Sequence, residues 1–263
     1  MRDNQKFKLV SSKKTRYLLP NILTLGGVCL GISSIKFSID GNFSLAVIFI
    51  LFAAILDALD GRVARLIKGT SEFGKELDSL TDFVSFGIAP VFILYFWELN
   101  NYGKLGWAIT LIYSVCCVLR LARFNLTKIS SQEAWKNNYF EGVPSPAGGL
   151  LILMPLIFEL SDLNLNYNLK NLTPYFTILV AILLVSKAPT LSLKKISISP
   201  KTTVFILLGI GTIFISLLFY TFLTLLIFGA VYILSIPLSF LMYKNQIKKE
   251  SFETSEDEHE DVL

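Results

Sequence analysis

Long hydrophobic stretches, separated by short polar connections, run along almost the whole chain. Each stretch is close to the roughly 20 residues that an α-helix needs to cross about 30 Å of hydrocarbon. Eight such segments can be placed, at residues 17–37, 43–66, 76–97, 105–123, 145–160, 173–190, 202–219 and 222–242. The last two run together, and we place their boundary near Tyr220 and Thr221. The pattern predicts an all-α, polytopic membrane bundle of about eight transmembrane helices.

The composition supports a membrane protein. Of the 263 residues, 53% are hydrophobic and 17% are charged, more hydrophobic than a soluble domain of this size requires. We divide the chain into a basic N-terminus at 1–16, a transmembrane domain at 17–243 and a charged tail at 244–263. The tail holds the only histidine, His259, and we expect it to be solvated and disordered.

Lysine and arginine gather on one side of the predicted bundle. They occur in the N-terminus, after the second, fourth and sixth segments, and after the last one. The positive-inside rule therefore places both termini in the cytoplasm. The net charge of +4 is explained by this topology and by attraction to anionic lipid, and it gives no reason to expect nucleic acid as a partner.

Two pairs of aspartates follow each other at a predicted cytoplasmic turn. Asp57 and Asp60 lie near the end of a hydrophobic segment, where an ionised carboxylate costs several kcal/mol unless it is compensated. Helical spacing places them on one face with two small residues and a cation, Gly61, Ala64 and Arg65. After a break near residues 68–71, a second stripe repeats every four residues, at Gly74, Asp78 and Asp82. The two helices can face each other with the carboxylates between them.

Four converging carboxylates would repel one another in a poorly solvated site. A bound divalent cation, or a pair of them, is the simplest compensation, and oxygen ligands favour Mg²⁺ or Mn²⁺ over zinc. The small residues leave room for a polyphosphate ester, and Arg65 can neutralise a phosphate oxygen. This pattern indicates phosphoryl transfer in which a spare carboxylate takes a proton from an incoming hydroxyl.

The same run resembles the signature of the CDP-alcohol phosphotransferases, D-x2-D-G-x2-A-R-x8-G-x3-D-x3-D, at every fixed position. The resemblance implies a six-helix core, here followed by two further helices, and a homodimer. It also implies two divalent ions, with Asp82 as the general base as well as a ligand. The implied ligands are Asp57, Asp60, Asp78 and Asp82, and the residues that make room for the CDP group are Gly61, Ala64 and Gly74.

Segments that lie mostly outside the signature bear on the acceptor alcohol. LPNILTLGG at 19–27, DSLTDFVSFGIAP at 78–90, RLARFN at 120–125, FEGVPSPAGG at 140–149 and SKAPTLSLKK at 186–195 resemble the bacterial and archaeal phosphatidylserine synthases of this family. The resemblance implies CDP-diacylglycerol and L-serine as substrates. It also implies a bacterial inner (cytoplasmic) membrane as the location, with the active site facing the cytoplasm.

Several polar residues are candidates for substrate contacts. Arg120 and Arg123 lie three residues apart, so two guanidiniums on one helix face could bind the serine carboxylate. Arg120 could equally pair with a phosphate or an aspartate, and Arg123 also fits the positive-inside pattern. Loop residues such as Asn125 and Ser145 could contact substrate or could form turns and caps. Asn21 and Thr24 could serve helix packing, while the resemblance suggests nucleotide contact.

Two alternatives stay open. Another member of the family would use a different acceptor, as a phosphatidylglycerophosphate or phosphatidylinositol synthase does. A cation transporter would use the aspartates as an ion path, although carboxylates near mid-bilayer on several helices are then expected. A covalent phosphatidyl-histidine route is disfavoured because His259 lies in the tail.

Overall fold

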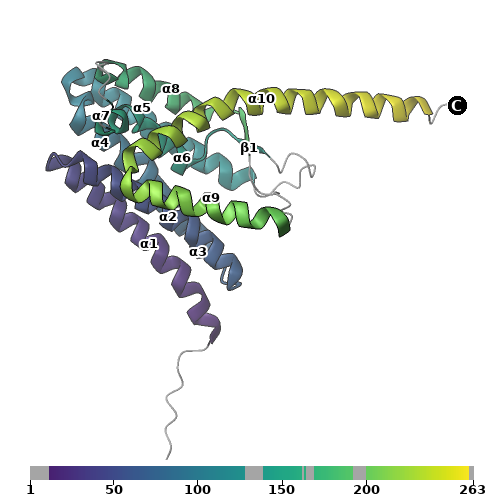
Figure 1. Ribbon diagram of the computed structural model, residues 1–263, viewed down its shortest axis with the longest axis horizontal. Coiled ribbons are helices and arrows are strands. Elements are labelled where there is room, and N and C mark those ends of the chain that lie inside the picture. Colours follow the sequence, from purple (N-terminus) through teal and green to yellow (C-terminus); the bar gives the residue numbers. More distant parts are fainter. Residues whose placement is uncertain (1–11, 128–138, 162, 164–168, 192–199, 261–263) are drawn as a thin grey trace, which may run out of the picture.

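Each of the eight predicted hydrophobic segments is helical over most of its length in the structure, a computed structural model that describes residues 12–127, 139–161, 163, 169–191 and 200–260. Figure 1 shows the helices gathered into one bundle, from which the C-terminal half of α10 projects. The elements in chain order are α1 (Ser12–Ile39), α2 (Phe43–Leu66), α3 (Glu72–Asp82), η1 (Phe83–Ile88), α4 (Ala89–Trp97), η2 (Leu99–Tyr102), α5 (Lys104–Thr127), β1 (Tyr139–Glu141), α6 (Ser145–Ile152), α7 (Met154–Leu160), η4 (Leu169–Leu172), α8 (Thr173–Val185), β2 (Pro189–Leu191), α9 (Pro200–Phe219) and α10 (Thr221–Glu260).

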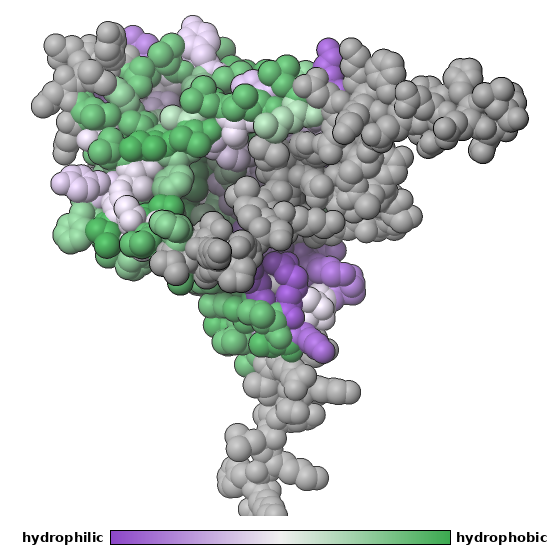
Figure 2. Space-filling view, turned by 45° about the vertical axis from the view of Figure 1, so that its right-hand side comes forward, coloured by the Kyte–Doolittle hydropathy of each residue, from purple (hydrophilic) through white to green (hydrophobic). Residues whose placement is uncertain are grey.

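The surface of the bundle is suited to lipid. Among the described residues, five helices are long and apolar enough to cross a membrane, and two shorter apolar helices span Leu169–Val185 and Leu207–Phe219. Large hydrophobic side chains such as Ile22, Phe52 and Val115 are exposed on the outside. Figure 2 shows hydrophobic side chains over much of the visible face and a hydrophilic patch near the lower end of the bundle. The protein is therefore an all-α integral membrane protein, apart from one short strand pair.

The structure departs from the predicted segments in three places. The segment 145–160 is broken at Leu153, because Pro155 has no N–H to continue the helix. The segment 173–190 ends as helix at Val185 and continues into β2. Residues 244–260 continue α10, where a disordered tail was expected, since the lysines and glutamates of this stretch are good helix formers. The boundary between α9 and α10 falls where it was predicted.

A tight turn joins α2 to α3 and sets their relative position. Lys68 adopts a left-handed conformation with φ of 51°, and the N–H of Gly69 returns to the carbonyl of Ala64 at 2.8 Å. The hydroxyl of Ser71 then caps α3 by accepting a hydrogen bond of 3.0 Å from the N–H of Gly74. The break expected near residues 68–71 is confirmed.

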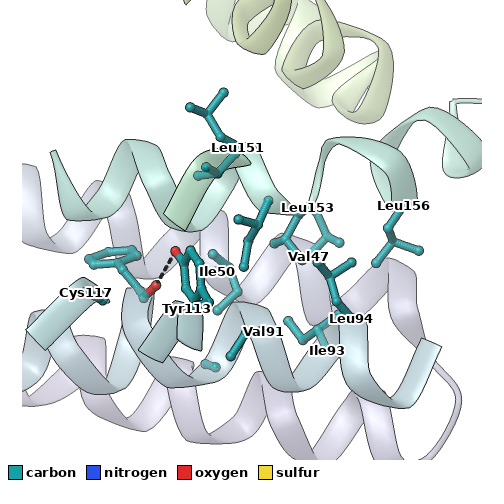
Figure 3. Packing of buried hydrophobic residues seen from close by; sticks show 14 of the residues in the cluster. Val47, Ile50, Val91, Ile93, Leu94, Tyr113, Cys117, Leu151, Leu153 and Leu156 are labelled. Atoms are coloured by element: carbon teal, nitrogen blue, oxygen red, sulfur yellow. Dashed lines mark hydrogen bonds between the residues drawn. The ribbon is translucent and has the colours of Figure 1, made fainter. Parts of the chain in front are cut away.

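The span that contains α3 and α4 includes a π-helical turn, η1, directly after Asp82. Pro90 cannot donate to the carbonyl of Phe86 one turn earlier, and the buried Tyr113 hydroxyl donates to that carbonyl at 3.0 Å (Figure 3). Around this bond, Figure 3 shows hydrophobic side chains from α2, α4, α5 and α6 packed together, among them Val47, Ile50, Val91 and Leu151. This core fixes the end of α3 on which Asp82 lies.

A two-stranded antiparallel ribbon, β1 with β2, positions the start of α6. Phe140 pairs with Thr190, and the following Gly142 has a φ of 76° and donates to the carbonyl of Ala188 at 2.9 Å. A side chain at Gly142 would place its Cβ 2.7 Å from the carbonyl oxygen of Ser186, so only glycine fits this turn. The ribbon ties the α5–α6 connection to the end of α8.

Candidate active site

The two aspartate stripes meet between α2 and α3. Carboxylate oxygens of Asp57, Asp60 and Asp78 lie within 4.8 Å of one another. Asp82 lies one helical turn beyond Asp78 on α3. Asp60 is only 4% exposed. The tertiary structure thus brings together three acidic groups from α2 and α3, with Asp82 one turn further along α3.

Thr24 on α1 supports the acidic cluster from one side. Its hydroxyl lies 2.6 Å from Oδ2 of Asp60 and 3.0 Å from the backbone carbonyl of Pro20. The single hydroxyl proton favours the nearer, charged acceptor. Thr24 is therefore a partner of a carboxylate, a role that its position in the sequence did not reveal because the two residues are 36 positions apart.

A cleft of 260 Å³ opens beside the aspartates. It is lined by Asp60 and Asp78 and by every residue that the sequence associated with the nucleotide: Asn21, Thr24, Gly61, Ala64, Arg65 and Gly74. A Cβ at Gly74 would lie 3.2 Å from Oδ1 of Asn21 and 3.1 Å from Oγ of Ser71, so this part of the cleft depends on glycine. The α2–α3 turn adds Gly69, Thr70 and Ser71 to the lining, and α3 adds Lys75; sequence reasoning missed these four residues.

Two successive hydrogen bonds connect Asp82 to Ser145 and Arg120. Ser145, the first residue of α6, is fully buried and donates a hydrogen bond of 2.7 Å to Oδ2 of Asp82. Nη1 of Arg120 donates to the same hydroxyl at 2.9 Å, and the guanidinium lies 5.2 Å from the centre of the Phe124 ring. Arg120 is 8% exposed, so these hydrogen bonds are shielded from water. The structure links Arg120 through Ser145 to an aspartate, which is one of the partners that the sequence left open.

Arg123 and Asn125 make contacts between helices. Arg123 donates to backbone carbonyls at the end of α8, with 2.8 Å to Val185 and 3.2 Å to Ser186. The side-chain amide of Asn125 donates to Oγ of Ser79 on α3 at 3.0 Å. These bonds hold the C-terminal part of α5 against the end of α8 and against α3.

Comparison with known proteins adds to this geometry. The family model for CDP-alcohol phosphatidyltransferase matches residues 17–185, which leaves α9 and α10 outside the matched range. A CDP-diacylglycerol–serine O-phosphatidyltransferase of Helicobacter pylori is 34% identical over 199 residues, covering 76% of this chain and 82% of that protein.

Two further relatives carry the same name. The Mycobacterium tuberculosis protein is 36% identical over 184 residues, which is 70% of this chain and 64% of the relative. The Bacillus subtilis protein is 32% identical over 155 residues, which is 57% of this chain and 84% of the relative.

Proposed function

The chain belongs to the CDP-alcohol phosphatidyltransferase family, and we propose that it transfers the phosphatidyl group of CDP-diacylglycerol to the hydroxyl of L-serine, releasing CMP. The observation that carries this proposal is the cluster of Asp57, Asp60 and Asp78, with Asp82 one helical turn further, beside a 260 Å³ cleft. Serine as the acceptor is supported by the relatives, which are named for that reaction.

The acidic cluster fits divalent metal ions. Its ligand atoms are all carboxylate oxygens, they lie within 4.8 Å of one another for Asp57, Asp60 and Asp78, and such donors suit Mg²⁺ or Mn²⁺. We propose two ions, held by these three aspartates together with Asp82. Bound ions would stabilise negative charge on the diphosphate and on the departing CMP.

The cleft serves the nucleotide end of CDP-diacylglycerol. Gly61, Ala64 and Gly74 leave space for it, and Asn21 offers an amide for hydrogen bonding. Arg65 is exposed at the cleft and can neutralise a phosphate oxygen. The exposed hydrophobic side chains of α1 and α2 support lateral entry of the lipid from the cytoplasmic leaflet.

Asp82 acts as the base on the acceptor. It takes the proton of the serine hydroxyl, the serine oxygen bonds to the phosphorus that carries diacylglycerol, and the bond from this phosphorus to CMP breaks. Arg120 uses guanidinium N–H groups other than the one bonded to Ser145 to hold the serine carboxylate. Arg123 and Asn125, which the sequence grouped with it, support Arg120 by holding α5 in place.

The setting of the reaction follows from charge and resemblance. The basic connections favour a cytoplasmic active site and cytoplasmic termini in a bacterial inner membrane. The family resemblance favours a homodimer, which cross-linking in native membranes would reveal as a doubled mass. Membrane lipids are the surrounding partners.

Acceptor specificity tests the proposal directly. Purified protein is incubated with CDP-diacylglycerol, Mn²⁺ and one alcohol at a time, and CMP release and the lipid product are followed by mass spectrometry. We expect phosphatidylserine with L-serine and little CMP with glycerol 3-phosphate or inositol. CMP release with one of those alcohols but not with serine would identify a different family activity. Metal flux into liposomes without CMP release under any acceptor would support a transporter.

A further inference from the structure

Ser145 contacts both Asp82 and Arg120, the two residues that act on the acceptor alcohol in the proposed reaction. We propose that Ser145 is a positioning residue that orients the Asp82 carboxylate for proton transfer and couples it to Arg120. This inference rests on the proposed function, in which Asp82 is the base and Arg120 binds serine. The Ser145 hydroxyl lies 2.7 Å from Oδ2 of Asp82 and 2.9 Å from Nη1 of Arg120.

The direction of the two hydrogen bonds is fixed by chemistry. A guanidinium can only donate, so Ser145 accepts from Arg120 and must direct its one proton to Asp82. The hydroxyl therefore cannot itself take a proton from substrate while both bonds persist. It serves as a fixed donor to Oδ2 of Asp82.

Burial strengthens the two hydrogen bonds of Ser145 and restricts their motion. Ser145 has no exposed surface and Arg120 is 8% exposed, so water cannot easily replace either partner. The ring of Phe124 packs against the guanidinium and restricts its motion. Ser145, itself held by Arg120, thus orients the Asp82 carboxylate.

The fold places Ser145 with little freedom. The β1–β2 ribbon and the glycine-only turn at Gly142 fix the approach of the chain to α6. Within α6, a Cβ at Gly148 would lie 2.7 Å from the Leu184 side chain, and one at Gly149 would lie 3.1 Å from Cβ of Phe86. The helix therefore packs closely against α8 and η1, which brings its first residue to Asp82.

Replacing Ser145 distinguishes an effect on the orientation of Asp82 from an effect on CDP-diacylglycerol binding. In Ser145→Ala, we expect kcat with serine to fall about 10- to 100-fold, as for loss of a buried hydrogen bond to a charged group. The KM for CDP-diacylglycerol should change less than about threefold, because Ser145 does not line the nucleotide cleft. Ser145→Thr keeps the hydroxyl and should recover most of the lost rate.

A matched control and a spectroscopic readout exclude a purely structural effect. Ser34 is also fully buried, but its hydroxyl bonds within α1 to the carbonyl of Gly31 at 2.6 Å, and Ser34→Ala should keep normal kcat. In difference infrared spectra, the carboxylate band lost in Asp82→Asn should shift in Ser145→Ala. Thermal unfolding and CDP-diacylglycerol binding verify that each variant is folded.

The outcomes distinguish this inference from the function on which it rests. A folded Ser145→Ala with kcat within about twofold of wild type, or an unshifted infrared band, overturns the role of Ser145 while leaving the reaction intact. If wild type uses a different alcohol, the serine proposal fails, and the same loss of kcat in Ser145→Ala is expected with that alcohol. If no alcohol supports CMP release, both proposals fail.

Discussion

The hydroxyl of Thr24 offers a test of how the acidic cluster is built. Thr24→Val keeps the shape of the side chain but removes the donor that lies 2.6 Å from Oδ2 of Asp60. Thr24 is 5% exposed and Asp60 is 4% exposed, so a water molecule cannot readily take the place of the hydroxyl. The carboxylate then loses the contact that fixes its orientation.

The size of the effect follows from the kind of bond. A hydrogen bond to a charged group contributes about 1.5–3 kcal/mol, and each 1.4 kcal/mol is a factor of ten in an equilibrium constant. Loss of a group that orients a metal ligand costs about 10- to 100-fold in metal affinity, which agrees with this range. We therefore expect Thr24→Val to weaken Mn²⁺ binding by about 10- to 100-fold.

Electron paramagnetic resonance of free Mn²⁺ during titration measures this affinity without substrate. Thr24→Ser keeps the donor and should bind Mn²⁺ almost normally. Thr110→Val is the matched control, because the Thr110 hydroxyl is equally buried but bonds within α5 to the carbonyl of Gly106 at 3.0 Å. A folded Thr24→Val with Mn²⁺ affinity within about twofold of wild type would refute the role of Thr24 and weaken the case for Asp60 as a ligand.

Three further substitutions test other parts of the site. Gly74→Ala places a Cβ 3.2 Å from Oδ1 of Asn21, so the KM for CDP-diacylglycerol should rise about tenfold, and an unchanged KM in a lipid titration would argue against the cleft as the nucleotide site. Arg123→Gln removes donors to carbonyls at the end of α8, including Ser186, and should lower the free energy of unfolding by about 1–3 kcal/mol in denaturant titrations. A large rise in serine KM with unchanged stability would instead make Arg123 a substrate ligand. Asp82→Asn should reduce turnover by about 100-fold or more while CDP-diacylglycerol binding persists, and near-normal CMP release would remove Asp82 from the role of base.

The sequence by itself determined the features that depend on local spacing. Hydrophobic runs of membrane length located all eight helical segments, because the cost of exposing apolar side chains and backbone groups acts on each segment separately. The helical period likewise determined that Asp57 shares a face with Asp60, and Asp78 with Asp82. The turn between these two pairs was short enough to predict that the stripes meet.

Only the tertiary structure decided which partners the polar side chains have. Thr24 meets Asp60 across 36 positions, and Ser145 meets Asp82 across 63, so no local pattern could identify either bond. Local rules placed Arg120 and Arg123 on one face, yet packing against α6 and α8 gave the first a buried link to Asp82 and the second a set of backbone carbonyls. Spacing along one helix fixes the direction of a side chain, while its partner depends on how the other helices pack around it.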